Sequence, residues 1–368
     1  MLAKHISLVN FRNIKEASVC FSEGTNVLFG DNAEGKTNLL EAIYYASIGK
    51  SFRGQHTNDL IRFGEKQACI SFDYFAGGRN QNLSFALAGH HKGVMKNKVK
   101  IGRVSEIVGH FRAVLFCPEH LSLIKDGPAE RRQFLDIAIS ASEPLYLASL
   151  QRYNHILKQR NALIKAAQKE DHTFSETVDI WSEQLASEGA KIAFYRQQYL
   201  DKCKDHVKDC FRDMTNEREI PSLSYEGPCG KGYDGYEDEK RTKDILFHKL
   251  TENNEREIYA GATLYGTHKD DVEVLLNQKS ARGFCSQGQQ RSLALSLKIA
   301  EGELCYADTG EYPVFLFDDV LSELDRGRRE YLLSHIKGKQ VIMTTCEKEG
   351  FFAEHTILVK NGTYTEAR

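Results

Sequence analysis

The stretch GDNAEGKT, from Gly30 to Thr37, constrains the fold of this chain more than any other segment. It follows the apolar run NVLF and precedes a helix-forming segment that begins near Asn38. The spacing G-x-x-x-x-G-K-[ST] is that of the P-loop, or Walker A motif, which joins a buried strand to a helix. Its glycines bring backbone N–H groups close to phosphate oxygens, and the helix N-terminus favours negative charge. The sequence therefore predicts a nucleotide-phosphate site at this loop.

Each residue of the loop is a candidate contact of the nucleotide. These residues are Gly30, Asp31, Asn32, Ala33, Glu34, Gly35, Lys36 and Thr37. The spacing predicts that Lys36 reaches the β- and γ-phosphates and that the Thr37 hydroxyl ligates Mg²⁺. An ordinary glycine-rich turn between a strand and a helix is the alternative interpretation. The strand–loop–helix context favours the nucleotide site.

A second apolar strand, PVFLFDD, ends in the adjacent carboxylates Asp318 and Asp319. A P-loop site needs an acid on another strand to hold its metal, and Asp318 at the strand end is predicted to hold Mg²⁺ directly or through water. Asp319 is the candidate that orients and deprotonates the attacking water. Two acids that cap the following helix are the alternative, but the Walker A loop favours the catalytic interpretation.

The segment CSQGQQRSLALSLKIAE precedes the Asp318 strand and decides the class of nucleotide-binding protein. It has the order and spacing of the signature motif of ABC ATPases, which binds the γ-phosphate held by the opposite subunit. Ser286, Gly288 and Gln289 are therefore candidate contacts of ATP across a dimer, at the N-terminus of a helix. A simple N-cap by Ser286 is the other interpretation, and one residue can do both. The residues from Ser322 to Asp325 are placed like a D-loop.

The rest of the chain suggests two lobes. Residues 1–120 are strand-rich, whereas two helical seams follow between residues 129 and 211, and they predict either an antiparallel arm or a helical layer on the core. We expect an ATP-binding head from residues 1–120 and 255–368 and a mostly helical inserted lobe from residues 121–254. No apolar run is long enough to span a membrane, and the scattered cysteines are typical of a cytoplasmic protein without a zinc site.

These motifs, in this order, resemble the RecF family of bacterial recombination mediators, which are ABC-type ATPases related to SMC heads. The resemblance extends over nearly the whole chain and includes, besides the motifs above, L-x-N-F-R-N at Leu8–Asn13, GKSFRG at Gly49–Gly54, VLFCPEHLSLI, GPAERRQFLD at Gly127–Asp136, LKQRNALIK and GTHKDD at Gly266–Asp271. It implies an α/β fold, an ABC-type P-loop head with a RecA-like core and an antiparallel β subdomain, carrying an inserted helical lobe.

The same resemblance implies the function. It implies ATP and Mg²⁺ as ligands, an ATP-dependent homodimer, and slow, DNA-stimulated ATP hydrolysis that acts as a switch. It implies binding to double-stranded DNA at gaps or junctions and cooperation with RecO and RecR to load recombinase. It also implies that Arg12 and Asn13 contact the nucleotide.

Four sites depart from the usual pattern of ABC ATPases or of the RecF family. Asp319 stands where most ABC ATPases have glutamate, and its shorter side chain predicts slow turnover. Cys346 stands at the position of the switch histidine, which it replaces poorly as a hydrogen-bonding group. Glu119 is the candidate for the Q-loop position, and the segment His268–Asp271 has no assigned role.

The interval from Tyr74 to Ser105 contains no acidic residue and is the predicted DNA surface. Its candidate residues are Lys92, Lys96, Lys98, Lys100 and Arg103, with Arg53, Arg131, Arg132, Lys158 and Arg160 as secondary candidates. Lys96, Lys98 and Lys100 alternate, so one strand would place them on one face toward phosphates. A solvated hairpin whose lysines block edge pairing is the alternative. The pair Arg131–Arg132 is expected to hold the lobe interface instead.

Two other classes of function use part of the same motif set. The ATPase subunit of a membrane transporter has the same three loops but normally lacks so long a helical insert. A monomeric P-loop kinase has no use for the Ser286 loop and phosphorylates a small acceptor without DNA. Stimulation of ATP hydrolysis by duplex DNA distinguishes the three.

Overall fold

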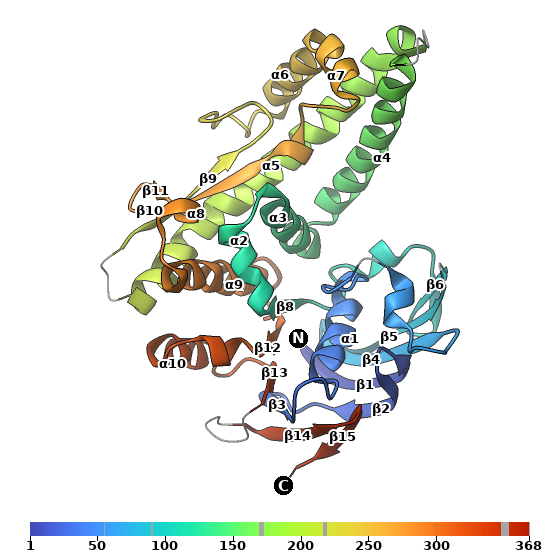
Figure 1. Cartoon of the computed structure of the whole chain (residues 1–368), viewed down its shortest axis with the longest axis vertical. Coiled ribbons are helices and arrows are strands. Elements are labelled where there is room, and N and C mark those ends of the chain that lie inside the picture. Colours follow the sequence, from blue (N-terminus) through green and yellow to red (C-terminus); the bar gives the residue numbers. More distant parts are fainter. Residues whose placement is uncertain (55, 90, 169–172, 216–218, 347–352, 368) are drawn as a thin grey trace. The chain divides into compact units, whose positions relative to one another are not determined.

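The computed structural model describes residues 1–54, 56–89, 91–168, 173–215, 219–346 and 353–367 (Figure 1). The chain forms two compact units, residues 1–120 with 297–368, and residues 121–296. The sequence places the second boundary at residue 254, so the second unit extends further than expected. The reason is a long-range pairing: β10 (Asp271–Leu276) forms antiparallel hydrogen bonds with β9 (Pro221–Glu226), which holds the intervening helices in the second unit.

The centre of the first unit is a sheet with the order β15-β14-β3-β13-β12-β8. Its strands are β3 (Thr25–Phe29), β8 (Ala113–Phe116), β12 (Val314–Asp318), β13 (Val341–Thr345), β14 (His355–Lys360) and β15 (Thr363–Glu366). All neighbouring strands are parallel except the pair β14–β15, and the apolar runs of β8, β12 and β13 are buried throughout. Such continuous apolar strands are typical of a parallel sheet covered on both faces.

A second, antiparallel sheet in the same unit has the order β2-β1-β4-β5-β6-β7. Its strands are β1 (Leu2–Phe11), β2 (Ile14–Cys20), β4 (Ala68–Ala76), β5 (Arg79–Ala88), β6 (His91–Lys96) and β7 (Val99–Ile101). Alternate residues of β4 are buried, as expected for a strand with one face toward a core. Helix α1 (Lys36–Ile48) contributes Leu39, Leu40 and Ile43 to a core that includes residues of both sheets. The predicted α/β head with an antiparallel subdomain is therefore confirmed.

Short helices complete the first unit: η1 (Thr57–Leu60), η2 (Val104–Ile107), η3 (Pro118–Leu121), η5 (Val320–Glu323) and α10 (Arg326–His335). Asp325 caps α10 by accepting a hydrogen bond from the backbone N–H of Arg328 at 3.0 Å.

The second unit is mostly helical. Its elements are α2 (Ser122–Lys125), α3 (Pro128–Ser142), α4 (Pro144–Ala167), α5 (Thr173–Thr215), α6 (Glu239–Glu252), α7 (Asn254–Ala260), η4 (Thr267–Lys269), β11 (Lys279–Ser280) and α8 (Ala281–Phe284), with β11-β10-β9 as its sheet. Polar side-chain pairs join the start of α4 to the middle of α5 and the end of α4 to the early part of α5, which shows that the two helices are antiparallel (Figure 1). Helix α9 (Gln287–Thr309) starts in this unit and ends in the first.

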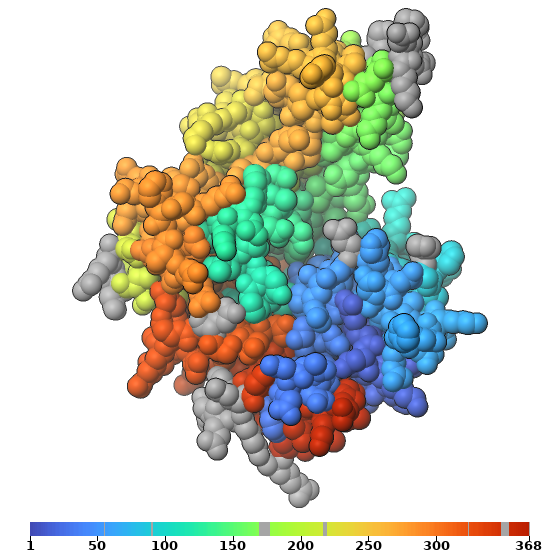
Figure 2. Space-filling view, in the orientation of Figure 1, coloured from blue at the N-terminus to red at the C-terminus, as the bar shows by residue number. Residues whose placement is uncertain are grey.

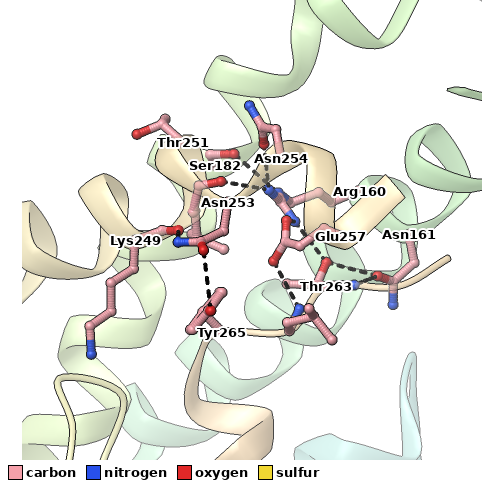
Figure 3. A network of polar contacts seen from close by, with 12 residues as sticks. Arg160, Asn161, Ser182, Lys249, Thr251, Asn253, Asn254, Glu257, Thr263 and Tyr265 are labelled. Atoms are coloured by element: carbon pink, nitrogen blue, oxygen red, sulfur yellow. Dashed lines mark hydrogen bonds and ion pairs between the residues drawn. The ribbon is translucent and has the colours of Figure 1, made fainter. Parts of the chain in front are cut away.

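A buried polar network joins the helices of the second unit and includes Arg160 and Asn161 of the LKQRNALIK motif (Figure 3). The Arg160 guanidinium forms an ion pair of 2.6 Å with the Glu257 carboxylate, and both side chains are fully buried. Arg160 also donates to the hydroxyls of Ser182 and Thr263 at 3.0 and 2.9 Å. The secondary DNA role expected for Arg160 is therefore wrong, because this cation faces the interior and its charge is neutralised there.

The segment His268–Asp271, which had no predicted role, forms a second set of polar contacts within the same unit. Arg196, which is nearly fully buried, donates to the Asp270 carboxylate at 2.8 Å, and burial raises the pKa of Asp270 to about 7. The Asp271 carboxylate accepts two hydrogen bonds from Arg131, at 2.6 and 2.9 Å, and Arg132 donates to the Asp270 backbone carbonyl at 2.6 Å. These two arginines are therefore used within the second unit, so the expectation that they hold the lobe interface is wrong, and they are not free for DNA.

Among the described residues, no helix combines the length and the apolarity needed to cross a lipid bilayer.

Candidate nucleotide-binding site

The phosphate loop leaves β3 and enters α1 through two glycines that no other residue could replace without strain. Gly30 has φ +152°, and a Cβ there would lie 2.2 Å from the carbonyl oxygen of Val359. Gly35, the N-cap of α1, has φ +114°, and a Cβ there would lie 3.1 Å from the Asn13 side-chain oxygen. Both backbone conformations favour glycine. The loop thus brings a tightly turned, glycine-containing backbone to the start of a helix, where an anion site forms.

Lys36, the first residue of α1, directs its side chain back over the loop. Its Nζ donates to the carbonyl oxygens of Gly30 and Asp31, at 2.5 and 2.8 Å, and the residue is only 7% exposed. The ammonium group is therefore held at the loop, where a phosphate would be bound. This position agrees with the role predicted for Lys36.

Thr37 and Asp318 come from distant parts of the sequence and meet in the structure. The Thr37 hydroxyl donates to the Asp318 carboxylate at 2.8 Å. Burial raises the pKa of Asp318, and hydrogen bonds from Thr37 and Thr344 partly offset that effect. A nearby cation would favour the ionised carboxylate. A hydroxyl and a carboxylate are hard oxygen ligands, so this pair fits Mg²⁺ that is also bound by water and phosphate.

Thr344, which the sequence analysis did not identify, organises the two aspartates. Its hydroxyl donates to the Asp318 carboxylate at 2.9 Å and accepts the backbone N–H of Asp319 at 3.0 Å. Asp318, the last residue of β12, pairs with Thr344, the penultimate residue of β13, so the strand register places this hydroxyl there. A threonine at the end of VIMTT was the available signal, but the sequence alone does not give the strand pairing.

Asp319 adopts a left-handed backbone conformation, with φ +52°. This conformation is uncommon for a residue other than glycine, and such outliers gather at functional sites. The Ser322 hydroxyl donates to the Asp319 carbonyl at 2.7 Å and thereby ties the predicted D-loop to the end of β12. The strained turn at Asp319 directs the chain away from the sheet immediately after Asp318, the candidate ligand of Mg²⁺.

Cys346 contacts the phosphate loop directly. Its thiol donates to the Asn32 side-chain oxygen at 2.9 Å, and Lys36 Nζ lies 3.6 Å from its sulfur. A thiol is a weak donor and a weak acceptor compared with imidazole. The position of the switch histidine is therefore adjacent to the loop and is occupied by a weaker hydrogen-bonding group.

Glu119 lies near the same edge of the sheet. Burial raises the pKa of the Cys117 thiol, and the Glu119 carboxylate raises it further. Glu119 also contributes to the raised pKa of Asp318. The Q-loop role of Glu119 stays a prediction.

The residues Arg12 and Asn13 differ in what they contact. Asn13 donates from its side-chain amide to the Ala33 carbonyl at 3.3 Å, so it touches the phosphate loop. Arg12 instead donates twice to the buried Glu41 carboxylate, at 2.9 and 2.6 Å. A guanidinium held in this bidentate manner is rigid and largely neutralised. The structure therefore brings Asn13, but not the charge of Arg12, to the loop.

Arg53, which was predicted on the DNA surface, is exposed and lies beside the nucleotide site. It donates to the Asn38 side-chain oxygen at 2.9 Å, beside the first turn of α1. Its charge also lowers the pKa of Asp318. The run GKSFRG leads back toward α1, and this return could not be deduced from spacing.

The signature segment begins α9 with a reciprocal cap. The Ser286 hydroxyl accepts the backbone N–H of Gln289 at 3.3 Å, and the Gln289 side-chain oxygen accepts the backbone N–H of Ser286 at 2.6 Å. This arrangement is a capping box. The N-cap interpretation of Ser286 is therefore confirmed, and its hydroxyl proton is still available for a phosphate oxygen because the cap uses only a lone pair.

The prediction that Lys96, Lys98 and Lys100 lie on one face of a single strand is wrong. Asn97 and Lys98, with φ +50° and +67°, form the tight turn between β6 and β7, so Lys96 and Lys100 lie on different strands. Lys96 pairs with Val99 and Lys100 with Met95, which places the two lysines on opposite faces. Two consecutive residues with positive φ are typical of a type I′ hairpin turn. Asn97 was the sequence signal for this turn, and the sequence analysis did not use it.

The basic residues of this hairpin consequently divide into two groups. Lys92 and Lys96 share the face of the buried Val94; Lys92 Nζ lies 5.7 Å from the centre of the Tyr45 ring, and Lys96 contacts His110. Burial lowers the pKa of both lysines. Lys98, Lys100 and Arg103 are exposed. The segment that contains β6 and β7 lies at the molecular surface (Figure 2).

Comparison with known proteins gives the family. The family model RecF/RecN/SMC N terminal domain matches residues 2–363. A DNA replication and repair protein RecF from Ruminiclostridium cellulolyticum is 37% identical over 353 residues, which is 95% of this chain and 94% of that protein. Another from Pediococcus pentosaceus is 39% identical over 352 residues, 95% of this chain and 93% of that protein. The chain belongs to the RecF family.

Solved structures agree with this RecF assignment. The structure of the recombination mediator protein RecF with ATP in the RecFOR pathway has a TM-score of 0.94 and 34% sequence identity, and the match covers 100% of this chain and 98% of that one. An SMC head bound to the C-terminal winged-helix domain of ScpA has a TM-score of 0.56 at 15% identity, over 99% of this chain and 97% of that one. The latter shows only that the RecF fold is shared with SMC heads.

Proposed function

We propose that this protein is an ATP-dependent recombination mediator that binds double-stranded DNA during gap repair, with RecO and RecR as partners. The observation that carries the proposal is the meeting of Lys36, Thr37 and Asp318 at one edge of the parallel sheet. Support for the DNA function comes from relatives described as DNA replication and repair proteins and from the RecF structure with ATP in the RecFOR pathway.

ATP occupies the phosphate loop of each copy in this proposal. Lys36 and the loop N–H groups bind its phosphates, while Thr37 and Asp318 hold Mg²⁺. When bound there, Mg²⁺ neutralises part of the triphosphate charge. Asn13 and Cys346 contact the loop, and Arg53 contacts the first turn of α1, so these side chains hold the loop and the helix start in place.

The dimer in this proposal is formed by two motifs, the phosphate loop of one copy and the Ser286 loop of the other. The Ser286 loop at the start of α9 contacts the γ-phosphate that the phosphate loop of a second copy holds. ATP then stabilises the dimer because it binds the closed pair more tightly than the separate copies. Hydrolysis removes the γ-phosphate contact and lets the copies separate. The reaction therefore acts as a switch that sets the lifetime of the dimer on DNA.

Replacement of Asp319 by asparagine is expected to slow ATP hydrolysis by about 10²- to 10⁴-fold, the usual contribution of a general base. Asparagine keeps the size of the side chain and tolerates the left-handed backbone conformation, but it cannot accept a proton from water. The closed dimer should persist correspondingly longer after ATP is added. Phosphate release and light scattering measure both effects, and an unchanged hydrolysis rate would remove Asp319 from this role.

The test of the DNA function is binding to a gapped duplex, measured with and without ATP over a series of salt concentrations. ATP should tighten binding, and each phosphate contact contributes about 0.9 to the slope of log affinity against log salt. A variant with alanine at Lys98, Lys100 and Arg103 should therefore reduce the slope by almost three.

The matched control has alanine at three exposed lysines of α5, Lys202, Lys204 and Lys208, and should keep the slope. Equal slopes in the hairpin variant and the wild type would show that DNA binds elsewhere. Absence of DNA binding with ATP present would contradict the proposed function itself.

A further inference from the structure

Glu219 lies outside every recognised motif, in the segment that leads into β9, yet it contacts the signature segment. Its carboxylate accepts a hydrogen bond from the side-chain Nε2 of Gln289. The same carboxylate adds to the burial effect that raises the pKa of the Cys285 thiol, next to Ser286. All of these residues belong to the second unit. The Glu219 carboxylate, from another segment of the chain, therefore contacts the first turn of α9.

This contact sets the orientation of the Gln289 amide. An ionised carboxylate has only acceptor atoms, so the amide must turn its NH₂ group toward Glu219. The other end of the amide, Oε1, then faces the backbone N–H of Ser286 and accepts it at 2.6 Å. Turning the amide over would place its NH₂ group against that N–H and its oxygen against the carboxylate. Glu219 thus favours one of two orientations.

We propose that Glu219 is a positioning residue of the ATP-dependent dimer: by orienting the Gln289 amide, it holds Ser286 in the shape that receives the γ-phosphate of the second copy. The inference rests on the proposed function, because it assumes that the Ser286 loop binds nucleotide in the dimer. Glu219 itself touches neither nucleotide nor metal. Its effect reaches the phosphate only through Gln289 and Ser286.

Two substitutions separate orientation from charge. Glu219→Ala removes the acceptor, so we expect the dimer to dissociate about tenfold more readily, the effect typical of losing a hydrogen bond to a charged group. Glu219→Gln can still accept from Gln289 through its own carbonyl oxygen, so it should dimerise as the wild type does. Sedimentation velocity with ATP measures the dimer, and a fluorescent ATP analogue should bind each separate copy with unchanged affinity.

A matched control is Glu273→Ala, which removes a carboxylate from β10 of the same sheet, where it contacts Lys231 instead of the signature segment. It should leave dimerisation unchanged. Hydrogen exchange of the Ser286 amide gives a readout that does not depend on the dimer. It should become several-fold faster in Glu219→Ala and stay near the wild-type rate in Glu219→Gln.

The outcomes distinguish this inference from the proposed function. Wild-type exchange and dimerisation in Glu219→Ala would overturn the inference and leave the proposed function intact. A Glu219→Gln variant as defective as Glu219→Ala would also overturn it, since charge and not orientation would then matter. A wild-type protein that stays monomeric with ATP would contradict both proposals, while the exchange data would still report on the contact.

Discussion

Replacement of Ser286 by arginine is expected to abolish the ATP-dependent dimer and to leave ATP binding by each separate copy intact. Ser286 is exposed at the start of α9, where a long cation would occupy the space that a second copy's γ-phosphate must enter. The phosphate loop lies in another part of the chain and keeps its own contacts. Light scattering with ATP should give the mass of one copy, whereas the wild type should give the mass of two.

The control for this experiment is Ser224→Arg, which makes the same change at an exposed position of β9 in the same unit. It should dimerise with ATP. A Ser286→Arg protein that dimerises as well as this control would show that the signature segment takes no part in the interface, and the proposed arrangement would be wrong.

Replacement of Arg160 by alanine should lower the free energy of unfolding by about 3–5 kcal/mol, the cost of leaving one member of a buried ion pair without the other. Glu257 would keep a fully buried carboxylate with no cation beside it, and Ser182 and Thr263 would each lose a hydrogen bond (Figure 3). Urea denaturation followed by circular dichroism measures the loss.

Two comparisons test the cause. The double substitution Arg160→Met with Glu257→Leu removes both charges, and it should recover most of the lost stability because desolvation opposes the attraction within a buried pair. The ion pair of Lys243 with Glu183 is partly exposed, and Lys243→Ala should cost no more than about 1 kcal/mol. A small loss in Arg160→Ala would mean that the network contributes little to the second unit.

Local sequence patterns predicted the parts of the site that depend on local structure. The P-loop spacing gives the glycine conformations and the position of Lys36, because they are set within one strand–turn–helix unit. The apolar run before Asp318 predicts a strand end that carries an acid. Its meeting with Thr37 follows from the motif, since both residues lie at the carboxyl edge of one parallel sheet.

The features that the sequence did not predict depend on contacts between distant segments and on one unrecognised turn. Thr344, Arg53 and the Arg12–Glu41 pair depend on strand order and on a returning loop, which spacing does not specify. The second unit extends past residue 254 because β10 pairs with β9 across intervening helices. The error at Lys96 and Lys100 came from treating a hairpin as one strand, although the Asn97–Lys98 turn reverses the chain there.

The central claim is that ATP is bound between the phosphate loop of one copy and the Ser286 loop of another. Mixing two defective variants tests it most directly. Lys36→Ala lacks a working phosphate loop but keeps its Ser286 loop, while Ser286→Arg has the opposite defect. Neither should dimerise alone, but the mixture can form one complete site, so sedimentation of a labelled variant should show a mixed dimer that requires ATP. A mixture that stays monomeric under conditions where the wild type dimerises would contradict the account.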